Sequence, residues 1–199
     1  SYAAHTMDNE HDRGRWHAHV SGATLMAMRV VVLGVGNILL TDEGLGVHAV
    51  EALRADYQVP PGLTLIDGGT SAMELLEDLE GLDLLIVLDA VRAGRPPATL
   101  IRLSGDQVPV FFRARLSPHQ VGLAEVLATL DLLGHPPRET VVLGIEPVSL
   151  ETRLGLTEPV AARLPELVQA VVDELGARGF AVRARTVAAV NRMSPALLP

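Results

Sequence analysis

The sequence contains no cysteine and no lysine, and aromatic residues make up only 3% of its 199 residues. Without cysteine, the chain has no disulfide framework, no thiolate metal site and no cysteine nucleophile. All 16 basic residues are Arg, which we interpret as a composition bias without mechanistic meaning. With so few aromatics, the core must be built from Leu, Val, Ala and Ile, which favours helices layered on a sheet.

Long apolar runs and basic clusters are also missing. The longest apolar stretch, residues 82–91, is interrupted by Asp83 and Asp89 and falls short of the ~18–20 residues of a membrane span. The net charge is −8, and no basic run with interleaved aromatics indicates nucleic-acid binding. We therefore expect no membrane insertion and no nucleic-acid partner. The absence of cysteine fits a cytoplasmic location.

The length is typical of one α/β domain, but the two ends of the chain differ from its middle. Residues 1–27 hold four of the seven His and the only Trp, show no sustained periodicity and are interpreted as a tag or flexible arm. We expect none of these His residues to take part in a site. Residues 28–180 are expected to form a single domain, and residues 181–199 a C-terminal tail.

From residue 29 onward, short apolar runs alternate with longer amphipathic ones. This alternation is typical of a three-layer α/β fold, in which a mostly parallel, twisted sheet has helices on both faces. The short runs predict strands over residues 30–34, 63–66, 82–88, 99–103 and 140–145. The longer runs predict helices over residues 44–56, 72–79, 119–133 and 159–175.

Ligands of open parallel sheets gather beyond the carboxyl ends of the strands, so the residues after each predicted strand are candidates for a site. The first such segment begins Gly34-Val35-Gly36, like a dinucleotide fingerprint, but Leu39 stands where the third Gly would be. Asp42 and Glu43 would also repel a pyrophosphate. Nucleotide binding is therefore the weaker alternative for this segment.

The same acidic residues suit a cation. Glu43, Asp89 and His119 follow three predicted strand ends, so we expect them on one rim, where they supply two carboxylates and one imidazole. These groups suit Ni²⁺ or Zn²⁺ and leave coordination positions open for water or substrate. A cation held there would polarise a scissile carbonyl and lower the pKa of a bound water. The residues alone leave nickel and zinc undecided.

Each of the three residues also has a purely structural interpretation. Glu43 can be an acid in a first helical turn, and His119 a histidine near a helix start. Asp89 is harder to explain in this way, since a buried carboxylate needs a metal, an Arg or backbone donors. Other catalytic patterns are weaker: G-x-S-x-G and H-E-x-x-H do not occur, and a triad of Ser117, His119 and an Asp is too compact in sequence.

Five separated blocks occur in order between residues 28 and 176. They are V-L-G-V-G-N-I-L-L-T-D-E-G at 32–44, D-G-G-T at 67–70 with M-E-L-L at 73–76, D-A at 89–90, L-S-P-H-Q-V-G-L at 116–123, and G-I-E-P at 144–147 with G-L-T at 155–157. Together they make the chain resemble the NiFe-hydrogenase maturation endopeptidases, which trim the C-terminus of a hydrogenase large subunit.

The resemblance implies a twisted, mainly parallel sheet between helices, with the family's metal-binding residues at Glu43, Asp89 and His119. It also implies peptide recognition by the loop of Asp67, Gly68, Gly69 and Thr70. The alternative for this loop is a tight glycine turn, which accounts for the glycines better than for the Asp.

The activity that the resemblance implies is metal-dependent proteolysis: an endopeptidase removes a C-terminal peptide from a hydrogenase large-subunit precursor. In the family the nickel has already been delivered to the precursor, so the three residues would bind a metal that the substrate carries. Another divalent cation can occupy the site in isolation, and we expect the free enzyme to bind nickel weakly because it offers no thiolate. The rival interpretations are a chaperone that checks nickel without cutting, and a nucleotide-binding protein that NAD or ATP would stabilise.

Overall fold

The computed structural model describes residues 28–113 and 118–185, and in this part of the chain one sheet has the strand order β3-β1-β4-β6-β5. The strands are β1 (Val30–Val35), β3 (Leu63–Gly69), β4 (Leu84–Ala90), β5 (Leu100–Ser104) and β6 (Thr140–Ile145). The first four strands in this order are parallel, and β5 pairs antiparallel with β6. The predicted mostly parallel sheet is therefore confirmed.

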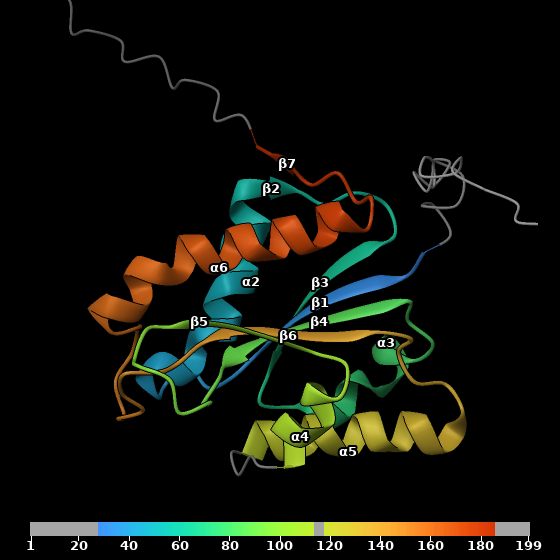
Figure 1. Cartoon of the computed structure of the whole chain (residues 1–199), viewed down its shortest axis with the longest axis horizontal. Coiled ribbons are helices and arrows are strands. Elements are labelled where there is room, and N and C mark those ends of the chain that lie inside the picture. Colours follow the sequence, from blue (N-terminus) through green and yellow to red (C-terminus); the bar gives the residue numbers. More distant parts are fainter. Residues whose placement is uncertain (1–27, 114–117, 186–199) are drawn as a thin grey trace, which may run out of the picture.

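Helices cover both faces of the sheet, as Figure 1 shows. On one face lie α2 (Leu45–Asp56) and α6 (Glu158–Ala177); on the other lie α3 (Leu76–Leu79), α4 (Gln107–Arg113) and α5 (Pro118–Leu133). Alternate residues of β1 belong to different cores: Val30 and Val32 pack on the α2 and α6 side, and Val31 and Leu33 on the other. The three-layer prediction is confirmed.

The two central strands β1 and β4 consist almost entirely of apolar residues, because helices cover both of their faces. All residues of β1 and of β4 are buried, as expected when helices pack on both faces of parallel strands. The cores are made mainly of Leu, Val and Ile, and the only three Phe of the sequence, Phe111, Phe112 and Phe180, are all buried in them. This agrees with the core composition expected from the scarcity of aromatics.

Three local features differ from the sequence prediction. Helix α4 lies between the strand predicted over 99–103 and the helix predicted over 119–133, where no helix was predicted, and the helix expected over 72–79 begins as the 3-10 helix η2 (Ala72–Leu75) before α3. In addition, β2 (Tyr57–Gln58) pairs antiparallel with β7 (Arg183–Ala184), and β7 lies in the segment that was expected to be a tail. Residues 1–27 and 186–199 lie outside the described part, so the domain boundaries stay a prediction.

The direction of β5 changes how the chain reaches α5. Residue Leu100 pairs with Ile145 and Ser104 with Val141, so the chain leaves β5 at the edge where the parallel strands begin. The prediction that the residues before α5 follow a strand end on the same rim as Asp89 was wrong in this respect. The start of α5 lies at the opposite edge, where Gln120 contacts Asp89.

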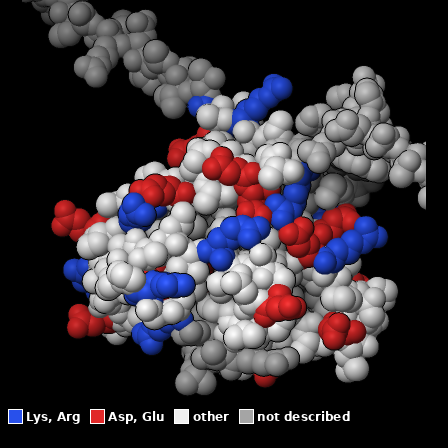
Figure 2. Space-filling view, in the orientation of Figure 1, with Lys and Arg blue, Asp and Glu red and all other residues white. Residues whose placement is uncertain are grey.

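Two surface properties of the described residues complete the fold. No helix within residues 28–113 and 118–185 combines the length and the apolar character that crossing a membrane would require. Figure 2 shows Arg and acidic side chains interspersed over the face in view, so charges of one sign do not dominate that face.

Candidate functional site

Glu43 lies in η1 (Thr41–Gly44), the 3-10 turn between β1 and α2, and only 7% of it is exposed. Its position depends on Gly36, whose φ is +134° and whose ideal Cβ would lie 1.8 Å from the Glu43 carbonyl oxygen. No side chain fits at that distance, so glycine at 36 lets the loop fold back over the end of β1. The Gly36 N–H donates to the Gly69 carbonyl at 2.9 Å, which joins this loop to the end of β3.

The start of α2 lies directly on the end of β4. A Cβ at Gly46 would lie 2.0 Å from the Leu88 carbonyl oxygen, and Leu88 immediately precedes Asp89. Helix α2 can approach β4 this closely only because residue 46 has no side chain. This contact brings η1, with Glu43 three residues before Gly46, against the carboxyl end of β4.

Asp89 is buried at the end of β4, with 1% of its surface exposed. The Gln120 side chain, which is 6% exposed, donates from Nε2 to Asp89 Oδ2 at 2.6 Å. Sequence reasoning named a metal, an Arg or backbone donors as the groups that could satisfy this carboxylate, and it missed the amide. The only available signal was that Gln120 directly follows the candidate histidine.

His119 occupies the first turn of α5, but its side chain lies outside the described part of the structure. The bond between Gln120 and Asp89 brings the backbone at the start of α5 to the end of β4. The structure thus gathers η1, the end of β4 and the start of α5 at one edge of the sheet. The role of Glu43, Asp89 and His119 as metal ligands stays a prediction.

Asp42, next to Glu43 in sequence, has a different environment. Its fully buried carboxylate accepts hydrogen bonds from the backbone N–H groups of Thr157 at 2.7 Å, Val148 at 2.9 Å and Ser149 at 3.0 Å. The Thr157 hydroxyl also donates to it at 2.9 Å. Asp42 therefore anchors the loop between β6 and α6, a structural role that sequence reasoning did not separate from that of Glu43.

Exposed apolar side chains border this edge. Leu154 is 71% exposed, and Ile38, Leu39 and Val148 are exposed as well. The two loops that carry them are joined, because the Arg153 N–H donates to the Leu39 carbonyl at 2.9 Å. We call these four residues the apolar border; exposed apolar groups that gather in this way are typical of surfaces that bind another molecule.

The Asp67 to Thr70 loop lies at the end of β3, on the same edge. Asp67 is exposed, and its Oδ1 accepts the Gly69 N–H at 2.9 Å. Gly69 has a φ of +46°, in the left-handed region that glycine adopts without strain. The segment therefore forms the tight glycine turn that was the alternative interpretation. Peptide recognition by Asp67, Gly68, Gly69 and Thr70 stays a prediction.

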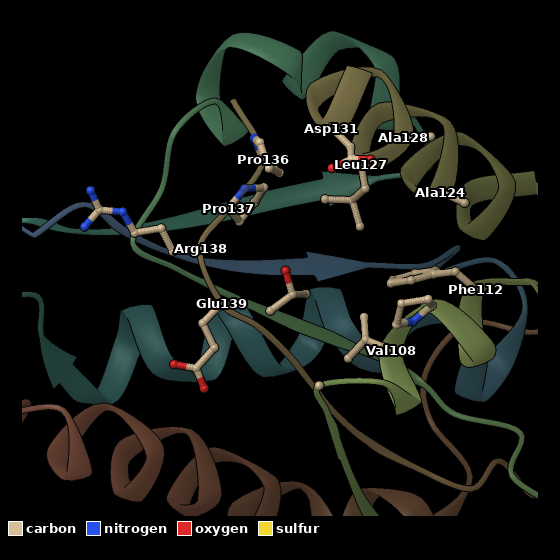
Figure 3. Close-up of a pocket in the computed structure, with 13 residues that line it drawn as sticks. Val108, Phe112, Ala124, Leu127, Ala128, Asp131, Pro136, Pro137, Arg138 and Glu139 are labelled. Carbon is tan, nitrogen blue, oxygen red and sulfur yellow. The ribbon is translucent and has the colours of Figure 1, made fainter. Parts of the chain in front are cut away.

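A cavity of about 650 Å³ lies elsewhere, between α4, α5 and the segment that leads into β6. Figure 3 shows Val108, Phe112 and Leu127 around it, with Arg138 and Glu139 turned outward. It is also lined by Thr140, where β6 begins, so it opens at the edge opposite to Asp89. Its mostly apolar lining and its position separate it from the candidate site.

Replacing Gly46 with Ala should disturb the candidate site through the backbone. The added Cβ overlaps the Leu88 carbonyl, and we expect a loss of about 1–3 kcal/mol in the free energy of unfolding, measured by urea denaturation. The matched control is Gly176→Ala in α6, where a Cβ would meet no atom within 4 Å. That change should stabilise the protein by up to about 1 kcal/mol. Equal effects of the two changes would contradict the close approach of α2 to β4.

The amino-acid sequence matches known proteins over most of its length. A profile of the hydrogenase maturation protease family matches residues 47–174. The hydrogenase 2 maturation protease of Escherichia coli K12 is 44% identical over 153 residues, which cover 76% of this chain and 93% of that protein. The hydrogenase expression/formation protein HoxM of Azotobacter vinelandii is 41% identical over 87% of this chain and 84% of its own length.

Solved structures agree with these sequence matches. The hydrogenase maturating endopeptidase HybD from Escherichia coli aligns with a TM-score of 0.76 and 43% identity, over 79% of this chain and 98% of that one. A NiFe hydrogenase maturation protease HybD from Thermococcus kodakarensis, with a TM-score of 0.61 and 24% identity over 74% of this chain and 99% of its own, supports the fold alone. The resemblance found in the sequence is thus confirmed: the chain belongs to the hydrogenase maturation protease family and is an endopeptidase.

Proposed function

We propose that this enzyme removes a C-terminal peptide from the large-subunit precursor of a NiFe hydrogenase, and that it requires nickel carried by the precursor. The observation that carries the proposal is the pair of buried carboxylates, Glu43 and Asp89, at one edge of the sheet in a member of this family. The reaction would take place in the cytoplasm, a location that the absence of cysteine fits.

The donor groups of the site suit the proposed metal. Glu43 and Asp89, at 7% and 1% exposure, supply carboxylate oxygens, which are suitable ligands for a divalent cation. With the imidazole of His119 they would form an oxygen and nitrogen set that leaves coordination positions for groups of the precursor. The chain has no cysteine, so no thiolate of the enzyme competes with thiolates of the substrate for the nickel.

The positions of the enzyme's own residues indicate which of them would bind the metal and which would bind the peptide. Glu43, Asp89 and His119 would hold the nickel-bearing end of the precursor, and nickel bound there would polarise the scissile carbonyl. The apolar border adjoins η1, where Ile38 lies against Gly44, and would contact apolar side chains of the peptide. The loop from Asp67 to Thr70 offers backbone groups and an exposed carboxylate for the same peptide.

The experiment that tests this function is incubation of the purified enzyme with the nickel-loaded precursor, followed by mass measurement of both products. We expect one shortened large subunit and one C-terminal peptide whose masses sum to that of the precursor plus water. A precursor that binds the enzyme but keeps its full mass would instead support a chaperone that checks nickel without cutting.

A further inference from the structure

We propose that Gln120 is a positioning residue, which holds the Asp89 carboxylate and the start of α5 in the arrangement that the metal site needs. The inference rests on the proposed metal site and adds to it a residue that would not contact the metal. It is carried by one buried contact, the 2.6 Å hydrogen bond from Gln120 Nε2 to Asp89 Oδ2.

The chemistry of this contact suits a cation site. Gln120 Nε2 donates to Asp89 Oδ2 at 2.6 Å, and hydrogen bonds that a carboxylate accepts are stronger than those between neutral groups. An Arg in the same place would satisfy Asp89 but would also cancel its negative charge. A neutral amide orients the carboxylate without placing a positive charge beside it. Carboxylates that bind metals are commonly held by such hydrogen bonds, which fix the orientation of the ligand.

The topology gives the same contact a second effect. Gln120 and Asp89 are 31 positions apart, and between them the chain passes through β5, which leads away from this edge, and through α4. The contact therefore joins the start of α5 directly to the end of β4. Since Gln120 directly follows His119, one hydrogen bond fixes the carboxylate of Asp89 and the backbone that carries the histidine.

The inference is tested by metal binding to the purified full-length protein, with Co²⁺ as a visible probe titrated to millimolar concentration. Gln120→Leu removes the amide donor, and we expect Co²⁺ to bind about 10–100-fold more weakly and with a changed absorption band. Asp89→Asn should bind still more weakly, because it removes a ligand. Thermal unfolding of each variant is recorded in parallel, since a purely structural role would lower the unfolding temperature without changing Co²⁺ affinity or the absorption band.

The matched control is Gln169→Leu. Gln169 also donates from Nε2 to an aspartate, Asp173 Oδ1 at 2.8 Å, but on the exposed surface of α6. The Gln169→Leu variant should bind Co²⁺ like the wild type. If Gln120→Leu fails to fold, Gln120→Asn decides, because it keeps a buried amide that is one methylene too short to reach Asp89.

The outcomes separate the inference from the function on which it rests. Weakened binding in Gln120→Leu or Gln120→Asn, with Gln169→Leu unchanged, supports the positioning role. If Asp89→Asn loses Co²⁺ while both folded Gln120 variants bind like the wild type, the positioning role is wrong and the metal site stands. If Co²⁺ binding does not depend on Asp89, the metal site itself is wrong, and the inference falls with it.

Discussion

Replacing Asp89 with Asn should lower the rate of precursor cleavage about 10³-fold and leave the fold intact. A metal that polarises a carbonyl is worth several kcal/mol, and each ~1.4 kcal/mol is a factor of ten in rate. The fold should persist because Asn has the shape of Asp and its Oδ1 can still accept the hydrogen bond from Gln120. The measurement is the single-turnover rate with nickel-loaded precursor, with thermal unfolding as the check on folding.

The same loss is expected for Glu43→Gln and for His119→Ala, since each removes one of the proposed ligands. The control is Asp78→Asn, which changes an exposed carboxylate on α3 and should leave the rate unchanged. Full activity in any one of the three site variants would contradict the proposed ligand set.

Replacing Asp42 with Ala should lower the free energy of unfolding by about 3–5 kcal/mol, because each buried donor that loses its acceptor costs about 1–3 kcal/mol and several lose it together. Three backbone N–H groups and the Thr157 hydroxyl lose their acceptor, and the loop between β6 and α6 loses its attachment to η1. Urea denaturation at neutral pH measures the change. Asp42→Asn should cost less, because its remaining carbonyl oxygen can still accept from part of this set.

The exposed Asp78 again supplies the control, as Asp78→Ala should change stability by less than about 0.5 kcal/mol. A loss below 1 kcal/mol in Asp42→Ala would show that the hydrogen bonds to Thr157, Val148 and Ser149 contribute little to stability. The assignment of Asp42 as a structural anchor would then be wrong.

The features that sequence predicted well depend on local pattern. The unbroken apolar runs of β1 and β4 indicate burial on both faces, and both strands are buried throughout. Asp89 stands at the end of such a run, so its burial was foreseeable from its neighbours alone. Helix α4 was missed because it is short, with Pro109 near its start, and the pairing of β2 with β7 was missed because each contributes two residues.

The features that sequence did not predict depend on contacts between distant segments. Asp42 and Glu43 are adjacent and equally acidic, but the hydrogen-bond partners of Asp42 lie more than 100 positions away. Gln120 and Asp89 lie 31 positions apart, and the antiparallel direction of β5, which lies between them in sequence, was not foreseen. Local pattern therefore indicated which residues were candidates, whereas the roles of Asp42 and Gln120 required the fold.

The central claim is that cleavage depends on nickel carried by the substrate. The direct test compares nickel-loaded and nickel-free precursor, incubated with the same purified enzyme, and measures the mass of the large subunit over time. We predict that the nickel-loaded precursor loses its C-terminal peptide and that the nickel-free precursor keeps its full mass. Cleavage of both precursors at equal rates would contradict the claim.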